Sequence, residues 1–204
     1  MELVHLGVAD AILRAIADAG KPLNKEHYLI SSAIKLESLP SAADVQQAWK
    51  ALRKQYPQIA AVADDSGTRF VYTVPSPAEL ETWAQETFIV ESTKSSADNL
   101  YTTLEPSPLF KIYYLKETRE LLFRMPHWRI DGIGLMDLQT AFLRIIADGP
   151  PADVQLDGSE AARLTPALDE VASVPLDNAF YEDSFVSQFL GEWKTALLKE
   201  LNVT

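Results

Sequence analysis

One short stretch of the chain holds residue types that suit proton transfer. It is the hexapeptide His-Trp-Arg-Ile-Asp-Gly, which runs from His127 to Gly132. A histidine titrates near neutral pH and therefore accepts a proton readily. Asp131, which Gly132 follows, is suited to hold the turn that separates it from His127. The spacing predicts general-base chemistry with His127 as the base, and the alternative interpretation is an ordinary structural histidine at a strand end.

The elements on either side of the hexapeptide are predicted from their hydrophobic periodicity. Residues 109–116 and 119–126 alternate as a pair of strands, and Leu121, Phe123 and Met125 share one face. His127 has the same parity, so a continued strand would turn it toward that apolar side. Asp131 is a predicted N-cap for a helix over residues 132–148, which Gly149 and two prolines end.

The rest of the chain predicts a mixed α+β architecture, with a mixed sheet sandwich covered by helices. Residues 92–108 and 150–180 are predicted to be irregular or loop-like. The other helices are expected over residues 8–19, 41–55, 75–85 and 183–201, and the other strands over 28–36, 59–63, 68–74 and 87–91. The last helix carries an aromatic stripe of Phe185, Phe189 and Trp193, which we interpret as core or interface.

Composition excludes several classes of function. The 204 residues carry a net charge of −11, which disfavours nucleic acids and anionic membranes as partners. Without cysteine there are no disulfides, thiolate metal sites or cysteine nucleophiles. No apolar run approaches the roughly 18 residues that span a bilayer, and residues 1–19 lack the apolar core of a signal peptide. We therefore expect a cytoplasmic protein. We also expect no metal site, because no pair of histidines has the spacing of metal ligands.

Three stretches together resemble the N-terminal half of condensation-type acyltransferases. They are the hexapeptide, which matches the HxxxDG motif, the hairpin over residues 108–125, and the helix over residues 45–52 with the following residues 55–59. This superfamily includes chloramphenicol acetyltransferase, peptide condensation domains, plant BAHD acyltransferases and fungal alcohol O-acetyltransferases. Condensation domains usually carry two adjacent histidines, whereas this chain has Pro126 before His127. The single histidine resembles BAHD-like members, which form esters or amides.

The resemblance implies a chloramphenicol acetyltransferase-like half-domain over residues 1–149. Residues 150–204 would then form a loop and an amphipathic helix that cross toward a second half or a partner. Members of this arrangement have about twice this length, and their second half carries a DFGWG-like motif that this chain lacks. The chain is therefore expected to be a domain, a cleavage product, a subunit of a two-chain enzyme or a homo-oligomer.

The resemblance also implies acyl transfer, for which such enzymes need a base, an oxyanion site and aligned substrates. His127 would be the base that activates a small-molecule hydroxyl or amine. Asp131 would brace the turn by pairing with an arginine, with Arg124, Arg129 or a distant one all possible, and Gly132 would permit close packing. Acyl-CoA, or a carrier-protein thioester, would be the donor, with no permanently bound cofactor or metal. The alternatives are a non-catalytic binding or assembly module and a condensation-like cyclase.

Overall fold

The computed structural model describes residues 2–5, 14, 17–18, 29–64, 69–92, 96–171 and 173. Its strands are β1 (Glu2–His5), β2 (Leu29–Lys35), β3 (Val62–Ala63), β4 (Arg69–Tyr72), β5 (Phe88–Glu91), β6 (Lys111–Leu115) and β7 (Glu120–Pro126). Its α-helices are α2 (Ala42–Gln55), α3 (Pro77–Thr87), α4 (Ala97–Tyr101), α5 (Gly132–Asp148) and α6 (Leu168–Val171). Three 3₁₀ turns are η2 (Pro57–Ala60), η3 (His127–Arg129) and η4 (Ser159–Arg163).

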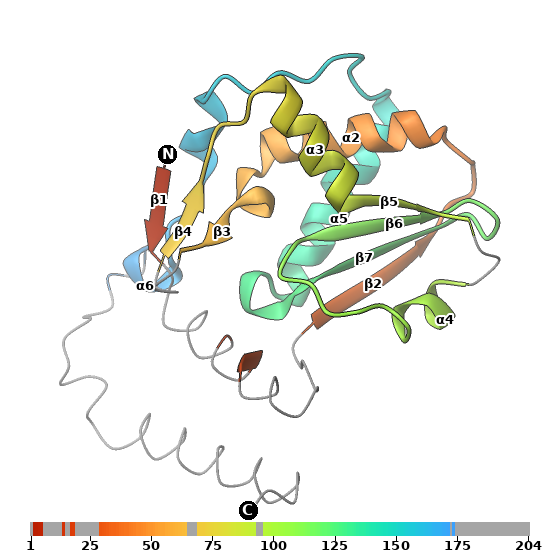
Figure 1. Ribbon diagram of the computed structural model, residues 1–204, viewed down its shortest axis with the longest axis horizontal. Helices are drawn as coiled ribbons and strands as arrows, with labels where there is room; N and C mark the ends of the chain where they lie inside the picture. The colour runs from red at the N-terminus through yellow and green to blue at the C-terminus, as the bar shows by residue number, and fades with distance from the viewer. Residues whose placement is uncertain are drawn as a thin grey trace, which may run out of the picture. The chain divides into compact units, whose positions relative to one another are not determined.

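The chain divides into two compact units, residues 1–167 and residues 168–204. The second unit contains α6 within its described part. The first unit holds two sheets (Figure 1). One has the strand order β1-β4-β3, and the other has the order β2-β7-β6-β5.

The four-stranded sheet is mixed. Strand β7 pairs antiparallel with both β2 and β6, whereas β5 and β6 are parallel. A parallel pair needs a crossover connection, and here the crossover contains α4. The predicted α+β class, with a mixed sheet and covering helices, is confirmed.

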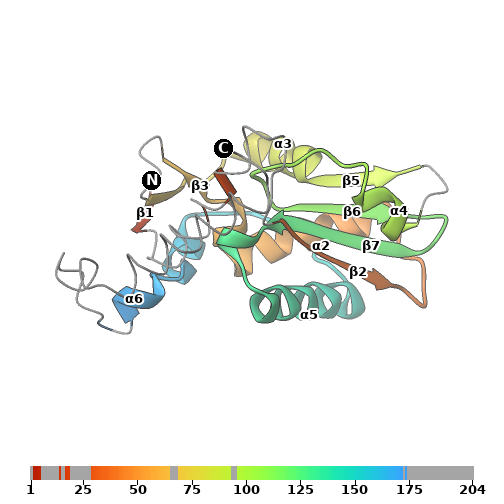
Figure 2. The same cartoon turned by 90° about the horizontal axis from the view of Figure 1, so that it is seen from below.

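Helices α2 and α5 cover one face of this sheet (Figure 2). From β7, Leu121, Phe123 and Met125 enter the main core, while Leu122 enters a smaller cluster with Ala97 and Leu100 of α4. This is the two-residue alternation expected of a strand, but with both faces covered. Residues 121–123 and 125–126 are all buried as a result.

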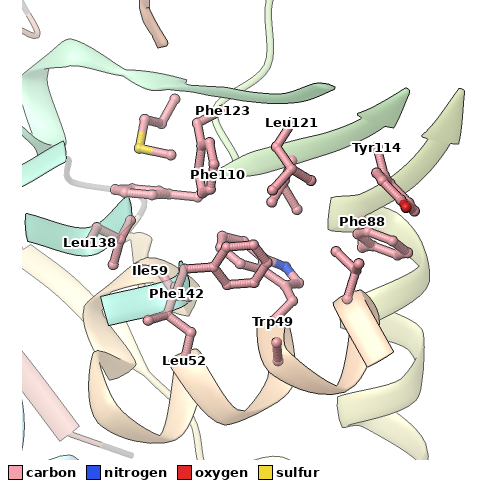
Figure 3. Packing of buried hydrophobic residues seen from close by; sticks show 14 of the residues in the cluster. Trp49, Leu52, Ile59, Phe88, Phe110, Tyr114, Leu121, Phe123, Leu138 and Phe142 are labelled. Carbon is pink, nitrogen blue, oxygen red and sulfur yellow. The ribbon is translucent and has the colours of Figure 1, made fainter. Parts of the chain in front are cut away.

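Large rings from both helices fill the main core (Figure 3). Trp49 of α2 lies edge-on to Phe142 of α5, and Phe142 lies edge-on to Phe123 of β7. The Trp49 indole also donates a hydrogen bond of 2.9 Å to Thr87 Oγ1, which satisfies its buried N–H. These contacts fix α5 against the strand that leads into the hexapeptide.

Local sequence signals account for the two long helices. Ser41 caps α2 by accepting from the Asp44 amide at 3.0 Å, and Asp131 caps α5 in the same way. Such caps satisfy amides that have no partner inside the helix. Gly149, at φ 86°, ends α5 in a conformation that disfavours other residues. The predicted helices over 41–55 and 132–148 are confirmed.

The segment after α5 is more structured than the loop predicted over residues 150–180. It contains η4 and α6, and Val154 packs with Ala51 and Leu80. Arg163 donates two hydrogen bonds to the Lys54 carbonyl, at 3.1 and 2.7 Å. Within the first unit, residues 150–167 therefore pack on α2 and its neighbours, and the functional division at residue 149 stays a prediction.

Several shorter elements differ from prediction. The sequence reveals neither β1 nor α4, because β1 has only four residues and α4 lies in a polar stretch. The hairpin predicted over 59–63 and 68–74 is present as β3 and β4, but Ile59 and Ala60 lie in η2 instead. Three predicted features lie outside the described residues. They are the turn at residues 65–67, most of the helix over 8–19, and the helix over 183–201 with Phe185, Phe189 and Trp193.

Candidate active site

His127 lies directly after the last residue of β7. The strand ends at Pro126, and His127 begins the 3₁₀ turn η3, so the strand does not carry the histidine onward. The Ile130 amide donates to the His127 carbonyl at 3.3 Å and closes this turn. The His127 side chain is half-buried, with its Nδ1 atom shielded from solvent. His127 therefore lies in the short turn between the end of β7 and the start of α5, with its ring half-buried.

Asp131 caps α5, and its role as N-cap is confirmed. Its Oδ1 accepts a hydrogen bond of 2.7 Å from the Gly134 amide. Within the described part of the chain, no arginine forms an ion pair with Asp131. Arg124 and Arg129, the nearby candidates, donate to main-chain carbonyls instead. Asp131 thus braces the turn through the helix end.

Among the described glycines, Gly134 is the one whose added Cβ would crowd its neighbours most. A Cβ on Gly132 would meet no atom of the described residues within 4 Å, so no close packing is seen there among them, and the supporting role of Gly132 stays a prediction. A Cβ on Gly134 would lie 3.0 Å from Ile130 Cγ1 and 3.2 Å from Asp131 Oδ1. The glycine-specific constraint therefore lies two residues beyond the hexapeptide motif.

Arg129 ties the turn to two distant loops. Its Nη2 donates to the carbonyls of Gln58, at 2.7 Å, and Ala61, at 2.5 Å. Its Nη1 donates to the carbonyl of Pro108 at 3.2 Å. Desolvation lowers the pKa of Arg129 to about 9, which leaves the guanidinium charged at neutral pH. The sequence singled out Arg129 only as a possible partner of Asp131, and no local signal shows its carbonyl contacts.

Aromatic rings line the same turn. The guanidinium of Arg129 lies 4.4 Å from the ring centroid of Phe110 and 5.2 Å from that of Phe70. Phe70 also stacks on Trp128, with centroids 5.5 Å apart and planes 3° from parallel. The guanidinium of Arg14 lies over the Trp128 ring, 5.3 Å from its centroid. The three-stranded sheet, through Phe70 of β4, thereby contacts the residue next to His127.

The first turns of α5 expose apolar side chains beside the hexapeptide. Ile133 is 68% exposed and Met136 is 59% exposed. They are three residues apart, so they lie on one face of the helix. Farther along α5, Gln139 is buried and accepts from Ser32 Oγ of β2 at 3.4 Å.

A second cluster of ionisable groups is buried around Tyr72. Its hydroxyl donates to Glu160 Oε1 at 2.8 Å, and Glu160 Oε2 accepts from the Gly158 amide at 2.9 Å. Arg53 lies over the rings of Tyr72 and Trp83, at 5.7 and 4.7 Å from their centroids. Burial, and then the hydrogen bond to Glu160, raise the pKa of Tyr72 to about 12, while burial lowers the pKa of Arg53. No local pattern in the sequence indicates this cluster, because its members are far apart in the chain.

The residues that the structure describes form no group of three or more His, Asp or Glu side chains that could hold a metal ion. None of the helices among them is long and apolar enough to cross a bilayer.

Known proteins similar to this chain are acetyltransferases. The acetyltransferase PigO of Monascus ruber is 34% identical over 180 residues, which are 83% of this chain and 39% of that protein. The O-acetyltransferase PigM of Monascus ruber is 26% identical over 190 residues, or 91% of this chain and 37% of that protein. No protein-family model matches the chain.

The fold is shared with a solved acetyltransferase. TRI3 trichothecene 15-O-acetyltransferase from Fusarium sporotrichioides superposes with a TM-score of 0.63 at 21% identity, over 97% of this chain and 45% of that one. The chain spans less than half the length of each of these proteins. The expected resemblance to acyltransferases is confirmed at this level: the chain is similar in sequence and in fold to a part of acetyltransferases.

Proposed function

We propose that this chain supplies the histidine-bearing part of an acyltransferase that moves an acetyl group from acetyl-CoA to a small-molecule hydroxyl. The observation that carries the proposal is the place of His127, half-buried between the end of β7 and the capped start of α5. The names of PigO, PigM and TRI3 support acetyl as the acyl group and, in two of the three, oxygen as the acceptor. We also infer a role in secondary metabolism, since TRI3 is named as a trichothecene 15-O-acetyltransferase.

His127 acts in this proposal as the general base. It takes the proton of the acceptor hydroxyl while the oxygen attacks the thioester carbonyl, and a tetrahedral oxyanion forms. The oxyanion collapses, the carbon–sulfur bond breaks, and the leaving thiolate of coenzyme A takes the proton from the imidazolium. The products are the acetyl ester and free coenzyme A. Asp131 and Arg129 hold the turn and take no proton.

A second polypeptide segment completes the site. The chain spans 39% of PigO and 37% of PigM, so most of each relative has no counterpart here. Ile133 and Met136 expose apolar surface beside the hexapeptide, which suits contact with a second half-domain or with another copy of the chain. In this proposal the chain forms one wall of the substrate site.

The test is acetyl transfer from acetyl-CoA to a panel of hydroxyl acceptors, followed by thiol release and product mass. The purified protein is assayed together with any polypeptide that purifies with it. His127→Ala is expected to lower the rate by about 10²- to 10⁴-fold, and His27→Ala, outside the motif, serves as the matched control. A His127→Ala rate above about one per cent of the unaltered rate excludes His127 as the base.

A second candidate is a non-catalytic binding or assembly module with the same fold. Intact and native mass spectrometry separate the two. A stable lone monomer that transfers no acetyl group to any acceptor supports the module. An assembly with a second polypeptide, or with further copies, that releases coenzyme A supports the enzyme.

A further inference from the structure

Arg129 connects the turn that bears His127 to two segments far away in sequence. Gln58 and Ala61 lie 71 and 68 residues before it, inside η2 and just beyond its end, and Pro108 lies 21 residues before it, near the start of β6. Three main-chain carbonyls therefore converge on one guanidinium. A planar group with five fixed donors is suited to this task, because its geometry fixes the relative positions of its acceptors.

The contacts of Arg129 are neutral or aromatic rather than ionic. Its partners are carbonyl oxygens and the faces of Phe110 and Phe70, and among the described residues no carboxylate pairs with it. A desolvated cation without an opposite charge costs free energy. An apolar residue would incur none of that cost, so the benefit of arginine at this position lies in the fixed geometry of its contacts.

The anchored turn is too short to move independently of its anchor. η3 has three residues, and His127 and Arg129 are its first and last. The turn is also fixed on its other side, where Trp128 stacks on Phe70. A shift of Arg129 therefore displaces the backbone of His127 as well.

We propose that Arg129 is the positioning residue of the site, and that its guanidinium sets the place of the His127 imidazole by joining η3 to Gln58, Ala61 and Pro108. The catalytic consequence rests on the proposed function, whereas the placement of the ring does not. A displacement of about 1 Å at a reacting group costs up to about 10²-fold in rate. Loss of the anchor should therefore lower kcat and leave the KM for acetyl-CoA nearly unchanged.

The first readout needs no activity. The chain has three histidines, so His127→Ala assigns the His127 imidazole resonance in a ¹H–¹³C spectrum of the ring. Arg129→Lys keeps the charge but loses the planar contacts, and it is expected to move the His127 resonance while the other two histidine resonances stay in place. Arg53→Lys is the matched control, because Arg53 is also buried against two aromatic rings but donates to none of the carbonyls that Arg129 binds.

The second readout is kinetic. Arg129→Lys is expected to lower kcat by about 10- to 100-fold with little change in KM, and guanidinium ion at millimolar concentration should restore part of the activity of Arg129→Ala. The proposal is overturned if the His127 resonance moves no more in Arg129→Lys than in Arg53→Lys. If the unaltered protein shows no acetyl transfer, the proposed function fails, and the resonance alone still decides the role of Arg129. If Arg129→Ala does not fold, Arg129→Lys carries the test.

Discussion

Within the hexapeptide, the side chains of His127, Arg129 and Asp131 have three different environments. His127 is half-buried at the end of the strand, Arg129 donates to carbonyls of other segments, and Asp131 accepts from the helix that follows. The side chains of Arg129 and Asp131 fix the backbone on either side of Ile130. In the proposed mechanism His127 carries out the proton transfer, whereas Arg129 and Asp131 support the backbone beside it.

The cap formed by Asp131 gives the first prediction. Asp131→Ala removes the acceptor for the Gly134 amide and should lower the free energy of unfolding by about 1 kcal/mol. Asp131→Asn keeps a capping oxygen and should lose only a few tenths of that. Denaturant unfolding of the two variants measures the difference. Equal losses in both would show that the charge of Asp131 at the helix N-terminus matters more than its capping oxygen.

The two glycines at the start of α5 give the second prediction. Gly132→Ala places its methyl group in open space and should stabilise the protein by about 0.5 kcal/mol, because alanine loses less backbone entropy. Gly134→Ala forces Ile130 or the Asp131 cap to shift and should destabilise it by about 1 kcal/mol. Thermal unfolding of the pair checks the opposite signs. A loss of stability in Gly132→Ala would contradict this account.

At the scale of elements, the cluster of Arg53, Tyr72 and Glu160 joins α2, β4 and η4. Tyr72 and Glu160 are fully buried and lie 88 residues apart in sequence. Their hydrogen bond attaches the segment after α5 to the strand that also carries Phe70. The elements that frame the hexapeptide are thus held by polar contacts as well as by the apolar core.

The pKa of Tyr72 makes this link sensitive to alkaline pH, which is the third prediction. The folded pKa of about 12 exceeds the ordinary value of 10, so between pH 10 and 12 the unfolded chain binds fewer protons and stability falls. Tyr72→Phe should cost about 1 kcal/mol at pH 8, through the lost hydrogen bond. The difference from the unaltered protein should shrink between pH 10 and 12, whereas the exposed-residue control Tyr101→Phe should show no such trend. Denaturant unfolding across this range checks the result, and a constant difference would contradict it.

The elements that the sequence predicts best are those whose ends are marked locally. Ser41, Asp131 and Gly149 mark the ends of α2 and α5, and the alternating apolar residues mark β7. The elements it misses depend on distant partners, such as β1, which pairs with β4 more than 60 residues away. The same distinction holds in the site: the Asp131 cap is local, whereas the carbonyls that bind Arg129 come from residues 58, 61 and 108.

At the scale of the whole molecule, the exposed apolar face beside the hexapeptide gives the fourth prediction. If a second half-domain or another copy covers Ile133 and Met136, then Met136→Glu should weaken that assembly and lower its acetyl transfer, because a charge would be buried against apolar surface. Val90→Glu is the control, since Val90 of β5 is also partly exposed at 40%. Native mass spectrometry measures the assembly, and equal effects of the two variants would contradict a specific contact at α5.

In the proposed mechanism, His127 is the base of an acetyl transfer. A single-turnover experiment tests this role of His127. It measures the formation of acetyl ester and free coenzyme A by the assembled protein, once with the unaltered chain and once with His127→Ala. We expect His127→Ala to lower the rate of the chemical step by about 10²- to 10⁴-fold, with the fold and the assembly intact. A His127→Ala protein that is folded and assembled and forms ester at more than about one per cent of the unaltered rate would exclude His127 as the base.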